Sequence, residues 1–396
     1  MRPKVLFLTT NGLLDQLGSS QILPYILNMS NTFNYVLFSI EKKKSLLQED
    51  KLKKLEALLR SKRIVWYKKE FSSYKINKLF VFLWINILYL FLLIKLNPDL
   101  IHLRSYMPAF ILYPLLRLTR KKYYFDIRGF EIDQMQEMNS LSKESIVYKL
   151  LKRYERRIIK NASGINVLSK EAKNFMIAQG LIDSKKIVSV VSTCVDHSKF
   201  SILETTQSDK QINICWLGNA GAGYRFEESV KFIKYFNNNI QKVNFLIINK
   251  NDHNLILKGL NEFSDDNLSF ELVSSSYEDI PKYLNTCSGS IFFYEWKDTG
   301  VSSVPTRLGE LLACGVPCLS LRSNGGYFKE IEDLGCMTLM EEFNEKEFST
   351  KGKEFLDLIR SKDIKYRCRE ASKKFFSLDN GIREYLSVMN KIIAKP

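Results

Sequence analysis

The chain has 396 residues, which exceeds one ordinary domain and suits about two domains of common size. Its 45 % apolar and 26 % charged residues, with 18 Gly and 9 Pro, exclude disordered, collagen-like and disulfide-scaffold proteins. The net charge of +16 is unevenly placed: residues 1–200 hold 34 basic and 16 acidic side chains, whereas residues 201–396 hold 25 and 27. The first half is therefore expected to meet nucleic acid or an anionic membrane surface.

The N-terminus and the cysteines indicate a reducing compartment. The apolar run at 5–8 is too short for the core of a signal peptide and is expected to be a first strand. The seven cysteines are an odd number and show no CxxC spacing. Neither a disulfide framework nor a zinc site is predicted, and a cytoplasmic location is expected.

Short apolar segments alternate with longer helical patterns along the chain, which is typical of repeated β-α units and parallel sheets. The expected strands of the first half are 4–8, 35–40, 64–68, 100–104, 123–128, 164–168 and 187–191. A polar stretch at 204–210 interrupts the pattern, and further strands are expected at 212–217, 243–248, 268–273, 290–294 and 317–321.

This pattern predicts two doubly wound, Rossmann-like α/β domains that face each other across a cleft. The predicted domains are 1–203 and 204–396, and the last helix, about 379–394, is a candidate to pack back on the first domain.

Two helical segments of the first half are candidates for membrane contact. The apolar segment 79–94 is shorter than the roughly 20 residues that cross a bilayer. It is expected to be a buried crossover helix. Two alternatives are a helix that also places an aromatic face in a membrane and a true membrane span. Segment 149–160 is a basic amphipathic helix. Contact with a membrane and an ordinary surface helix, whose apolar side packs on the core and whose charged side faces solvent, are equally open interpretations of this segment.

In the first domain, candidate site residues lie at or after the carboxyl ends of three expected strands. Ligands of such sheets bind beyond the carboxyl ends of the strands. The loop and helix start after the first strand include Gly18 and Ser19, which could cradle part of a ligand. Arg104 ends the expected strand at 100–104, and Asp126 and Arg128 lie at the end of the expected strand at 123–128; all three are candidate catalytic residues. A structural Arg104–Asp126 ion pair is the alternative, because buried charges need partners.

The second domain carries a glycine-rich turn after the strand at 212–217. Gly218 and Asn219 open this turn, and Arg225 follows it, so backbone and cation could both approach a phosphate. The turn is not a dinucleotide fingerprint, because Ala220 stands where that motif needs glycine.

Residues 302–317 are the most informative segment of the second domain. Ser303, an early proline and Thr306 mark the start of a helix, whose free N–H groups suit a phosphate. Arg307 and Glu310 are three residues apart and share one helix face. This places one cation for a diphosphate beside one carboxylate for sugar hydroxyls, and a surface ion pair is the alternative.

Four segments together resemble the family 4 glycosyltransferases, and more narrowly a bacterial branch of that family. They are Arg-Ser-Tyr-x-Pro-Ala at 104–109, Phe-Asp-Ile-Arg-Gly-Phe at 125–130, Ser-Thr-Cys-Val-Asp at 192–196, and the thirteen residues from Pro305 to Pro317. The resemblance implies a GT-B fold and transfer of a sugar from a nucleotide-sugar with retention of configuration. It further implies no cofactor, no obligatory metal, and an acceptor held by the N-terminal domain.

The resemblance also assigns roles to individual positions. Glu310 matches the glutamate that contacts the nucleotide ribose, and Arg307 matches the basic residue at the same helix start. Arg225 or Asn219 matches the basic pair that holds the diphosphate, and Gly18 with Ser19 matches an N-terminal loop near the donor phosphate. The chain departs from the family at Ser302, where a glutamate is frequent, and at Arg104 and Arg128, where histidines are frequent.

The resemblance and the charge split together predict a peripheral glycosyltransferase on the inner face of the cytoplasmic membrane. Its expected partners are a nucleotide-sugar donor, a lipid-linked or other cell-surface glycan acceptor, and the anionic membrane surface; no nucleic acid is expected. Two alternatives stay open. One is a pseudoenzyme that binds nucleotide or glycan, because Ser302 stands where the family frequently has glutamate. The other is a nucleic-acid-binding protein that uses the basic half.

Overall fold

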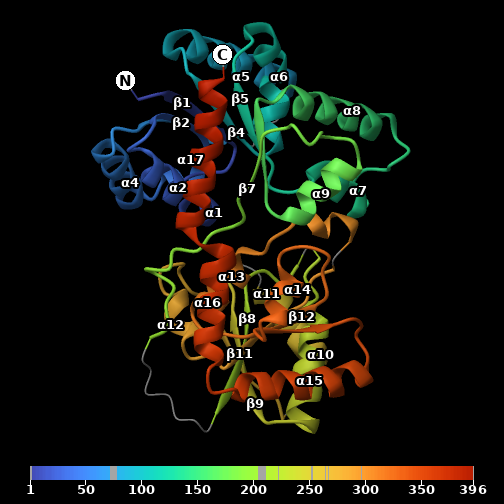
Figure 1. Cartoon of the computed structure of the whole chain (residues 1–396). Helices are drawn as coiled ribbons and strands as arrows, with labels where there is room; N and C mark the ends of the chain where they lie inside the picture. The colour runs from blue at the N-terminus through green and yellow to red at the C-terminus, as the bar shows by residue number, and fades with distance from the viewer. Residues whose placement is uncertain are drawn as a thin grey trace. The chain divides into compact units, whose positions relative to one another are not determined.

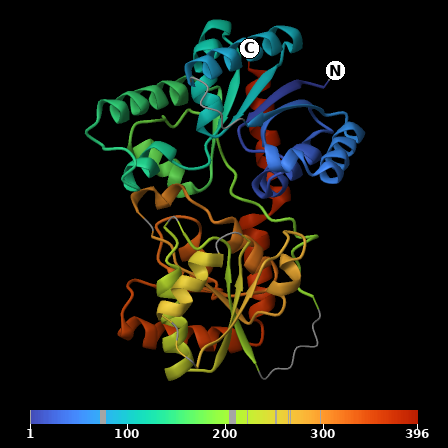
Figure 2. The same cartoon turned by 180° about the vertical axis from the view of Figure 1, so that it is seen from behind.

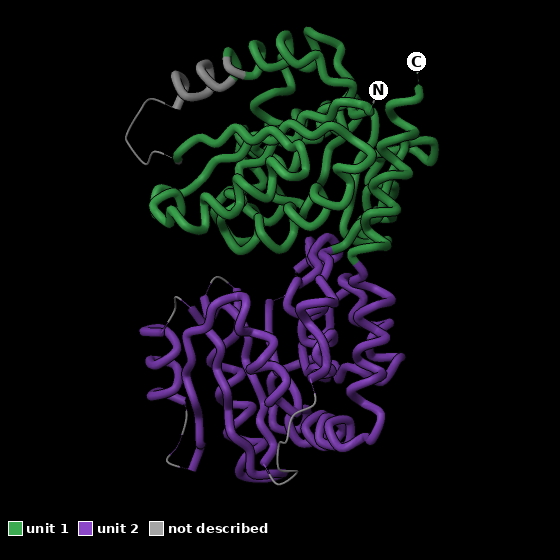
Figure 3. Tube along the Cα trace, turned by 90° about the vertical axis from the view of Figure 1, so that its left-hand side faces the viewer, with its two compact units in different colours: residues 1–192, 378–396 green, residues 193–377 purple. Residues whose placement is uncertain are grey.

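The computed structural model describes residues 2–71, 78–203, 211–221, 223–250, 253–263, 265, 267–295 and 297–395, with backbone alone at 71, 78–85 and 88. Two compact units divide the chain: unit 1 is residues 1–192 with 378–396, and unit 2 is residues 193–377 (Figure 3). The polar stretch expected to join the domains, 204–210, lies outside the described residues.

The division falls after Ser192, earlier than the expected boundary at residue 203. The reason is that the segment after Ser192 is bonded within unit 2. The N–H of Val195 donates to the carbonyl of Phe376 over 2.9 Å, and the N–H of Leu203 donates to Asn285 Oδ1 over 2.7 Å. Residues 193–203 therefore belong to the second unit.

Unit 1 is built on a seven-stranded parallel sheet with the order β3-β2-β1-β4-β5-β6-β7. The strands are β1 (Lys4–Thr9), β2 (Asn34–Lys42), β3 (Val65–Phe71), β4 (Leu100–Arg104), β5 (Tyr123–Asp126), β6 (Gly164–Val167) and β7 (Val188–Val190). The strand order reverses between β1 and β4, and the register places Arg104 beside Asp126 at the carboxyl ends. Ligands of doubly wound sheets bind outside this edge, at such a reversal.

Helices cover both faces of this sheet. They are α1 (Gln16–Gln21), α2 (Leu23–Met29), α3 (Lys43–Leu46), α4 (Glu49–Ser61), α5 (Lys78–Leu96), α6 (Tyr106–Thr119), α7 (Glu131–Glu137), α8 (Ile146–Asn161), α9 (Lys170–Ala178) and α17 (Leu378–Ala394). Right-handed crossovers place α5, α6, α8 and α9 on the face opposite to α2 and α4. Helix α17 packs against α2 and the strands β4, β6 and β7, and Figure 1 shows it running along unit 1.

The apolar segment 79–94 forms most of α5, which connects β3 to β4, so the expected crossover helix is confirmed. Among the described residues, no helix has both the length and the apolar character needed to cross a bilayer. The aromatic side chains expected to face a membrane at 80, 82 and 84 lie outside the described residues.

Unit 2 contains a six-stranded parallel sheet with the order β10-β9-β8-β11-β12-β13. Its strands are β8 (Ile212–Leu217), β9 (Val243–Ile248), β10 (Ser269–Val273), β11 (Gly289–Phe292), β12 (Cys318–Leu321) and β13 (Met337–Met340). Its helices are α10 (Phe226–Asn239), α11 (His253–Phe263), α12 (Ile280–Leu284), α13 (Thr306–Ala313), α14 (Phe328–Asp333), α15 (Glu345–Arg360) and α16 (Ile364–Phe376). Helix α16 packs on α13 on the side shown in Figure 1, and α10 with α11 covers the side shown in Figure 2.

The sheet cores explain why these segments fold as strands. Residues of β5 and β6 are buried along their whole length, as expected for parallel strands that are covered on both faces. In unit 2, Trp216 at the end of β8 is fully buried against Phe226 of α10. The burial of these continuous apolar runs positions the polar residues that follow each strand.

Candidate functional site

In unit 2, the guanidinium of Arg307 lies against the backbone of Gly218. A Cβ atom at Gly218 would lie 3.0 Å from Cζ of Arg307, so the glycine makes room for this side chain. Gly218 also has a φ of +108°, a conformation that L side chains rarely adopt. The glycine-rich turn after β8 and the start of α13, which are far apart in the sequence, therefore meet at Arg307.

The guanidinium of Arg307 packs on an aromatic ring and keeps one buried donor without a hydrogen bond to any described residue. Its Cζ lies 4.4 Å from the ring centroid of Tyr224, a cation–π arrangement. Its Nη1 is buried and has no hydrogen-bond partner among the described residues. A buried charged donor left unsatisfied costs free energy that a bound anion would recover.

Helix α13 begins at Thr306, as the proline and hydroxyl residues predicted, with Pro305 at its N-cap. No side chain of the described residues caps this helix start. The N–H of Leu308 donates to the carbonyl of Pro305 over 3.2 Å, and the N–H groups of Thr306 and Arg307, which precede it, are the ones suited to an anion. Ser302 is buried, and its hydroxyl donates to the carbonyl of Thr299 over 2.8 Å. Ser303 has an extended backbone and lies between a short 3-10 helix, Asp298–Ser302, and Pro305.

Glu310 is buried one turn along the same helix. Its Oε1 accepts a 2.9 Å hydrogen bond from the hydroxyl of Tyr277, which follows β10. Burial raises the pKa of Glu310 to about 7, although the hydrogen bond and Arg307 both favour the charged form. The carboxyl group can therefore change its charge near neutral pH, and it can accept hydrogen bonds from hydroxyl groups.

Arg225 and Asn219 lie in or next to the same turn, but their side chains are more exposed to solvent than that of the buried Glu310. Arg225 pairs with Glu295 over 3.0 Å, and both side chains are more than two-fifths exposed. Such an exposed pair contributes little stability, so a phosphate could replace the carboxylate. The side chain of Asn219 is exposed to solvent.

In unit 1, Gly18 and Ser19 lie on α1 after the loop that follows β1. A Cβ at Gly18 would approach the carbonyl oxygen of Gly12 to 2.0 Å, so Gly18 is required for close packing of the helix on this loop. The hydroxyl of Ser19 donates to the carbonyl of Gln16. A residue that the sequence analysis did not single out holds the loop: buried Glu41 accepts hydrogen bonds from the N–H groups of Leu13 and Leu14.

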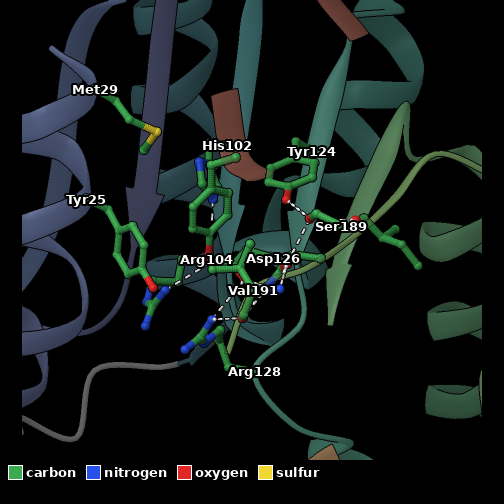
Figure 4. A network of polar contacts seen from close by, with 12 residues as sticks. Tyr25, Met29, His102, Arg104, Tyr124, Asp126, Arg128, Ser189 and Val191 are labelled. Carbon is green, nitrogen blue, oxygen red and sulfur yellow. Dashed lines mark hydrogen bonds and ion pairs between the residues drawn. The ribbon is translucent and has the colours of Figure 1, made fainter. Parts of the chain in front are cut away.

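The three predicted catalytic residues are brought together in unit 1 by one buried carboxylate (Figure 4). Asp126 pairs with Arg104 Nη1 over 2.9 Å and with Arg128 Nη1 over 3.6 Å. The ion pair offered as the structural alternative for Arg104 and Asp126 is therefore present. Arg128 is the most exposed of the three, and a catalytic role for any of them stays a prediction.

Other buried groups complete this cluster. Asp126 accepts hydrogen bonds from Asn166 Nδ2 over 2.9 Å and from the hydroxyl of Tyr385 over 3.0 Å, and His102 Nε2 lies 3.5 Å away. Burial opposes the charged form of Asp126, but Arg128, His102 and Arg104 together outweigh it and hold its pKa well below the usual range. Burial lowers the pKa of His102, although the neighbouring Asp126 favours the charged ring.

The sequence signals for the unpredicted residues differ. Tyr224 belongs to the glycine-rich turn, so the sequence placed it near the candidate phosphate site. Its ring contact with Arg307 could not be predicted from the sequence. Tyr277, Glu41 and Tyr385 carry no local motif. Among the described residues, no group of three or more His, Cys, Asp or Glu could hold a metal ion, and metal independence stays a prediction.

No protein-family model matches the chain. No curated protein matches its sequence either. Solved structures do match: the fold is GT-B, two Rossmann-like domains, and it covers the whole chain.

Three of these structures indicate the range of proteins with this fold. Sucrose-phosphate synthase from Thermosynechococcus elongatus aligns with a TM-score of 0.71 at 10 % identity, over 99 % of this chain and 100 % of that one. Anabaena HepE, solved with UDP and glucose, gives 0.65 at 11 % identity over 98 % and 100 %. The lipopolysaccharide outer core galactosyltransferase WaaB gives 0.65 at 12 % identity over 98 % and 99 %.

Proposed function

We propose that the protein is a glycosyltransferase that moves a sugar from a nucleotide-sugar to a lipid-linked or other cell-surface glycan. Unit 2 binds the donor, and unit 1 binds the acceptor at the inner face of the cytoplasmic membrane. The observation that carries the donor site is the buried Nη1 of Arg307, which has no hydrogen-bond partner in the described part of the chain and lies beside the glycine turn at the start of α13.

The chemistry of a diphosphate fits this arrangement. A phosphate oxygen would satisfy Arg307 Nη1, and its charge would be stabilised by the helix N-terminus. Glu310, one turn further, is placed to accept hydrogen bonds from ribose hydroxyls. HepE, which shares the fold, was solved with UDP, and a uridine nucleotide is therefore the first donor class to test.

In the proposed reaction, the bond between the sugar and the diphosphate breaks, the oxygen of the acceptor hydroxyl forms the new glycosidic bond, and the hydroxyl proton passes to a phosphate oxygen of the departing diphosphate. Negative charge grows on the departing diphosphate, and Arg307 and the start of α13 stabilise it without reorganisation. Removing one such donor raises a barrier by roughly 2–4 kcal/mol. The resemblance to family 4 supports retention of configuration and independence of metal.

The first experiment measures thermal stabilisation by UDP, GDP, CDP, their sugar conjugates and NAD. One nucleoside diphosphate family is expected to raise the melting temperature. Arg307→Gln is expected to weaken that nucleotide at least tenfold, whereas Arg360→Gln, an arginine on α15 that bonds Gln241, is the matched control. Stabilisation by NAD alone would contradict the proposal.

The second experiment measures transfer to a lipid extract, with the configuration of the product read by NMR and with chelator added to test metal independence. Donor binding without any product would favour the pseudoenzyme. Tight, salt-sensitive binding of nucleic acid without donor binding would favour the nucleic-acid-binding alternative.

A further inference from the structure

Helix α8 presents apolar side chains to solvent as well as to the core. Its inner face buries Glu155, Ile158 and Ile159. On its first turns, Ile146, Val147 and Leu150 are each more than half exposed. Single exposed apolar side chains are common on soluble proteins, but neighbouring ones that form a contiguous patch mark an interaction surface.

These apolar residues continue into a groove between α8 and α6. The groove has a volume of about 660 Å³ and is lined by apolar and aromatic side chains of both helices. The lining residues are Met107, Phe110, Ile111, Leu150, Leu151 and Tyr154, with Arg153 and Arg157 beside them. Met107 is itself more than half exposed, so α6 contributes to the same apolar surface.

One cation of α8 forms ion pairs within unit 1, whereas several others form none with the described residues. Lys152 pairs with Asp133 and Glu155. The exposed side chains of Lys149, Arg153, Arg157 and Lys160 make no hydrogen bond or ion pair within the described part of the chain. They are therefore free to meet an anionic partner, unlike Lys152.

We propose that this surface, formed by α6 and α8 and here called the α6–α8 surface, docks on an anionic lipid bilayer. The aliphatic side chains enter the boundary of headgroups and acyl chains, and the free cations of α8 contact anionic headgroups. The inference rests on the proposed function for the kind of surface that the enzyme must reach, and it assigns that contact to specific residues.

Two other occupants fit the surface less well. A second copy of the chain in a two-fold dimer would bring the same uncompensated cations of α8 against each other. Nucleic acid would meet the cations, but it would leave the exposed aliphatic side chains of Ile146, Val147 and Leu150 in water. A bilayer complements both the charge and the aliphatic side chains.

The test is binding of the purified full-length chain to vesicles of phosphatidylcholine with and without phosphatidylglycerol. Binding is expected to need the anionic lipid and to weaken with salt. Arg153→Gln with Arg157→Gln, and separately Ile146→Gln with Leu150→Gln, are each expected to lower the partition coefficient about tenfold or more. Glutamine keeps helix propensity, and melting temperatures check folding.

Matched controls come from other helices of unit 1. Lys43→Gln with Lys44→Gln removes two exposed cations of α3, and Leu47→Gln with Leu58→Gln removes two exposed leucines. These variants are expected to change the partition coefficient less than about twofold. Equal losses in the control and the α8 variants, equal binding to neutral vesicles, or no vesicle binding would overturn the inference.

Nucleotide stabilisation of the same variants separates this inference from the proposed function. The α8 variants are expected to keep the full shift, because they lie in unit 1 and the donor site in unit 2. Loss of nucleotide binding in Arg307→Gln with vesicle binding intact would support both statements. Absence of nucleotide binding in the unaltered protein would contradict the proposed function alone.

Discussion

The hydroxyl of Tyr385 donates a 3.0 Å hydrogen bond to Oδ2 of Asp126, although the two residues are 259 positions apart. Tyr385 lies on α17, and Asp126 ends β5 at the carboxyl edge of the sheet of unit 1. The last helix is thereby bonded to the buried ion cluster of unit 1. Together with the packing of α17 on α2, β4, β6 and β7, this contact joins residues 378–396 to the unit that contains the N-terminus.

Tyr385→Phe is expected to destabilise unit 1 by about 1.5–3 kcal/mol, because it removes a buried hydrogen bond to a charged acceptor but keeps the ring. Hydrogen-exchange mass spectrometry of peptides from α17 and β4 measures the change. Tyr366→Phe, at an exposed position of α16, is the control and should leave exchange unchanged. Equal protection in Tyr385→Phe and the unaltered protein would show that the bond contributes nothing.

Asp126→Asn is expected to cost more, about 3–5 kcal/mol, because it leaves Arg104 and Arg128 without their buried counter-charge. The pKa of Asp126 is lowered by folding, so its contribution is present above the ordinary value of 3.8 and is lost as the pH falls toward the lower folded value. Denaturant unfolding at neutral and acid pH should show the difference from the unaltered protein shrinking below this range.

The exposed Asp50→Asn is the matched control for Asp126→Asn and should change stability by less than about 0.5 kcal/mol. If Asp126→Asn left the free energy of unfolding unchanged at pH 7, the structural role of the cluster would be contradicted.

Glu310 predicts a pH dependence of opposite sign in unit 2. Folding raises its pKa from 4.5 to about 7, so the folded state binds the proton more tightly. Its contribution is therefore complete below about pH 4.5 and is lost as the pH rises through 7. Glu310→Gln should match the unaltered protein at pH 4 and exceed its stability at pH 8, by on the order of 3 kcal/mol.

Calorimetric melting of both proteins across this pH range measures the effect of Glu310. The exposed Glu262→Gln in the same unit is the control and should follow the unaltered protein at every pH. A Glu310→Gln curve parallel to that of the unaltered protein would show that this carboxyl group does not titrate in the range.

Gly218→Ala tests the contact between the glycine turn and Arg307. The added Cβ would press on the guanidinium at 3.0 Å in a backbone conformation unfavourable for alanine. We expect a loss of about 1–3 kcal/mol in unit 2 and nucleotide binding weakened at least tenfold. Gly180→Ala, with φ of +63° and no atom within 4 Å of the added Cβ, should cost only about 1 kcal/mol and leave nucleotide binding intact. Unchanged binding in Gly218→Ala would separate Arg307 from the donor site.

The strands were predictable because each is a short apolar run bounded by polar or turn residues. The expected strand bounds at 100–104, 212–217 and 243–248 are confirmed to the residue. Strand β13, Met337–Met340, was missed because two of its four residues are methionine, which has no strand preference that sets it apart from helix. Its assignment depends on pairing with β12, which is a tertiary contact.

The sequence by itself determined the two parallel-sheet domains, the helix start at Thr306 and the neighbourhood of Arg104 and Asp126, because these follow from local periodicity and strand ends. Only the tertiary structure decided which side chains share a proton or a charge. Tyr277 reaches Glu310 from 33 residues away, and Tyr385 reaches Asp126 from the last helix. No local pattern encodes such pairs, because the partners are brought together by packing of elements that are distant in the chain.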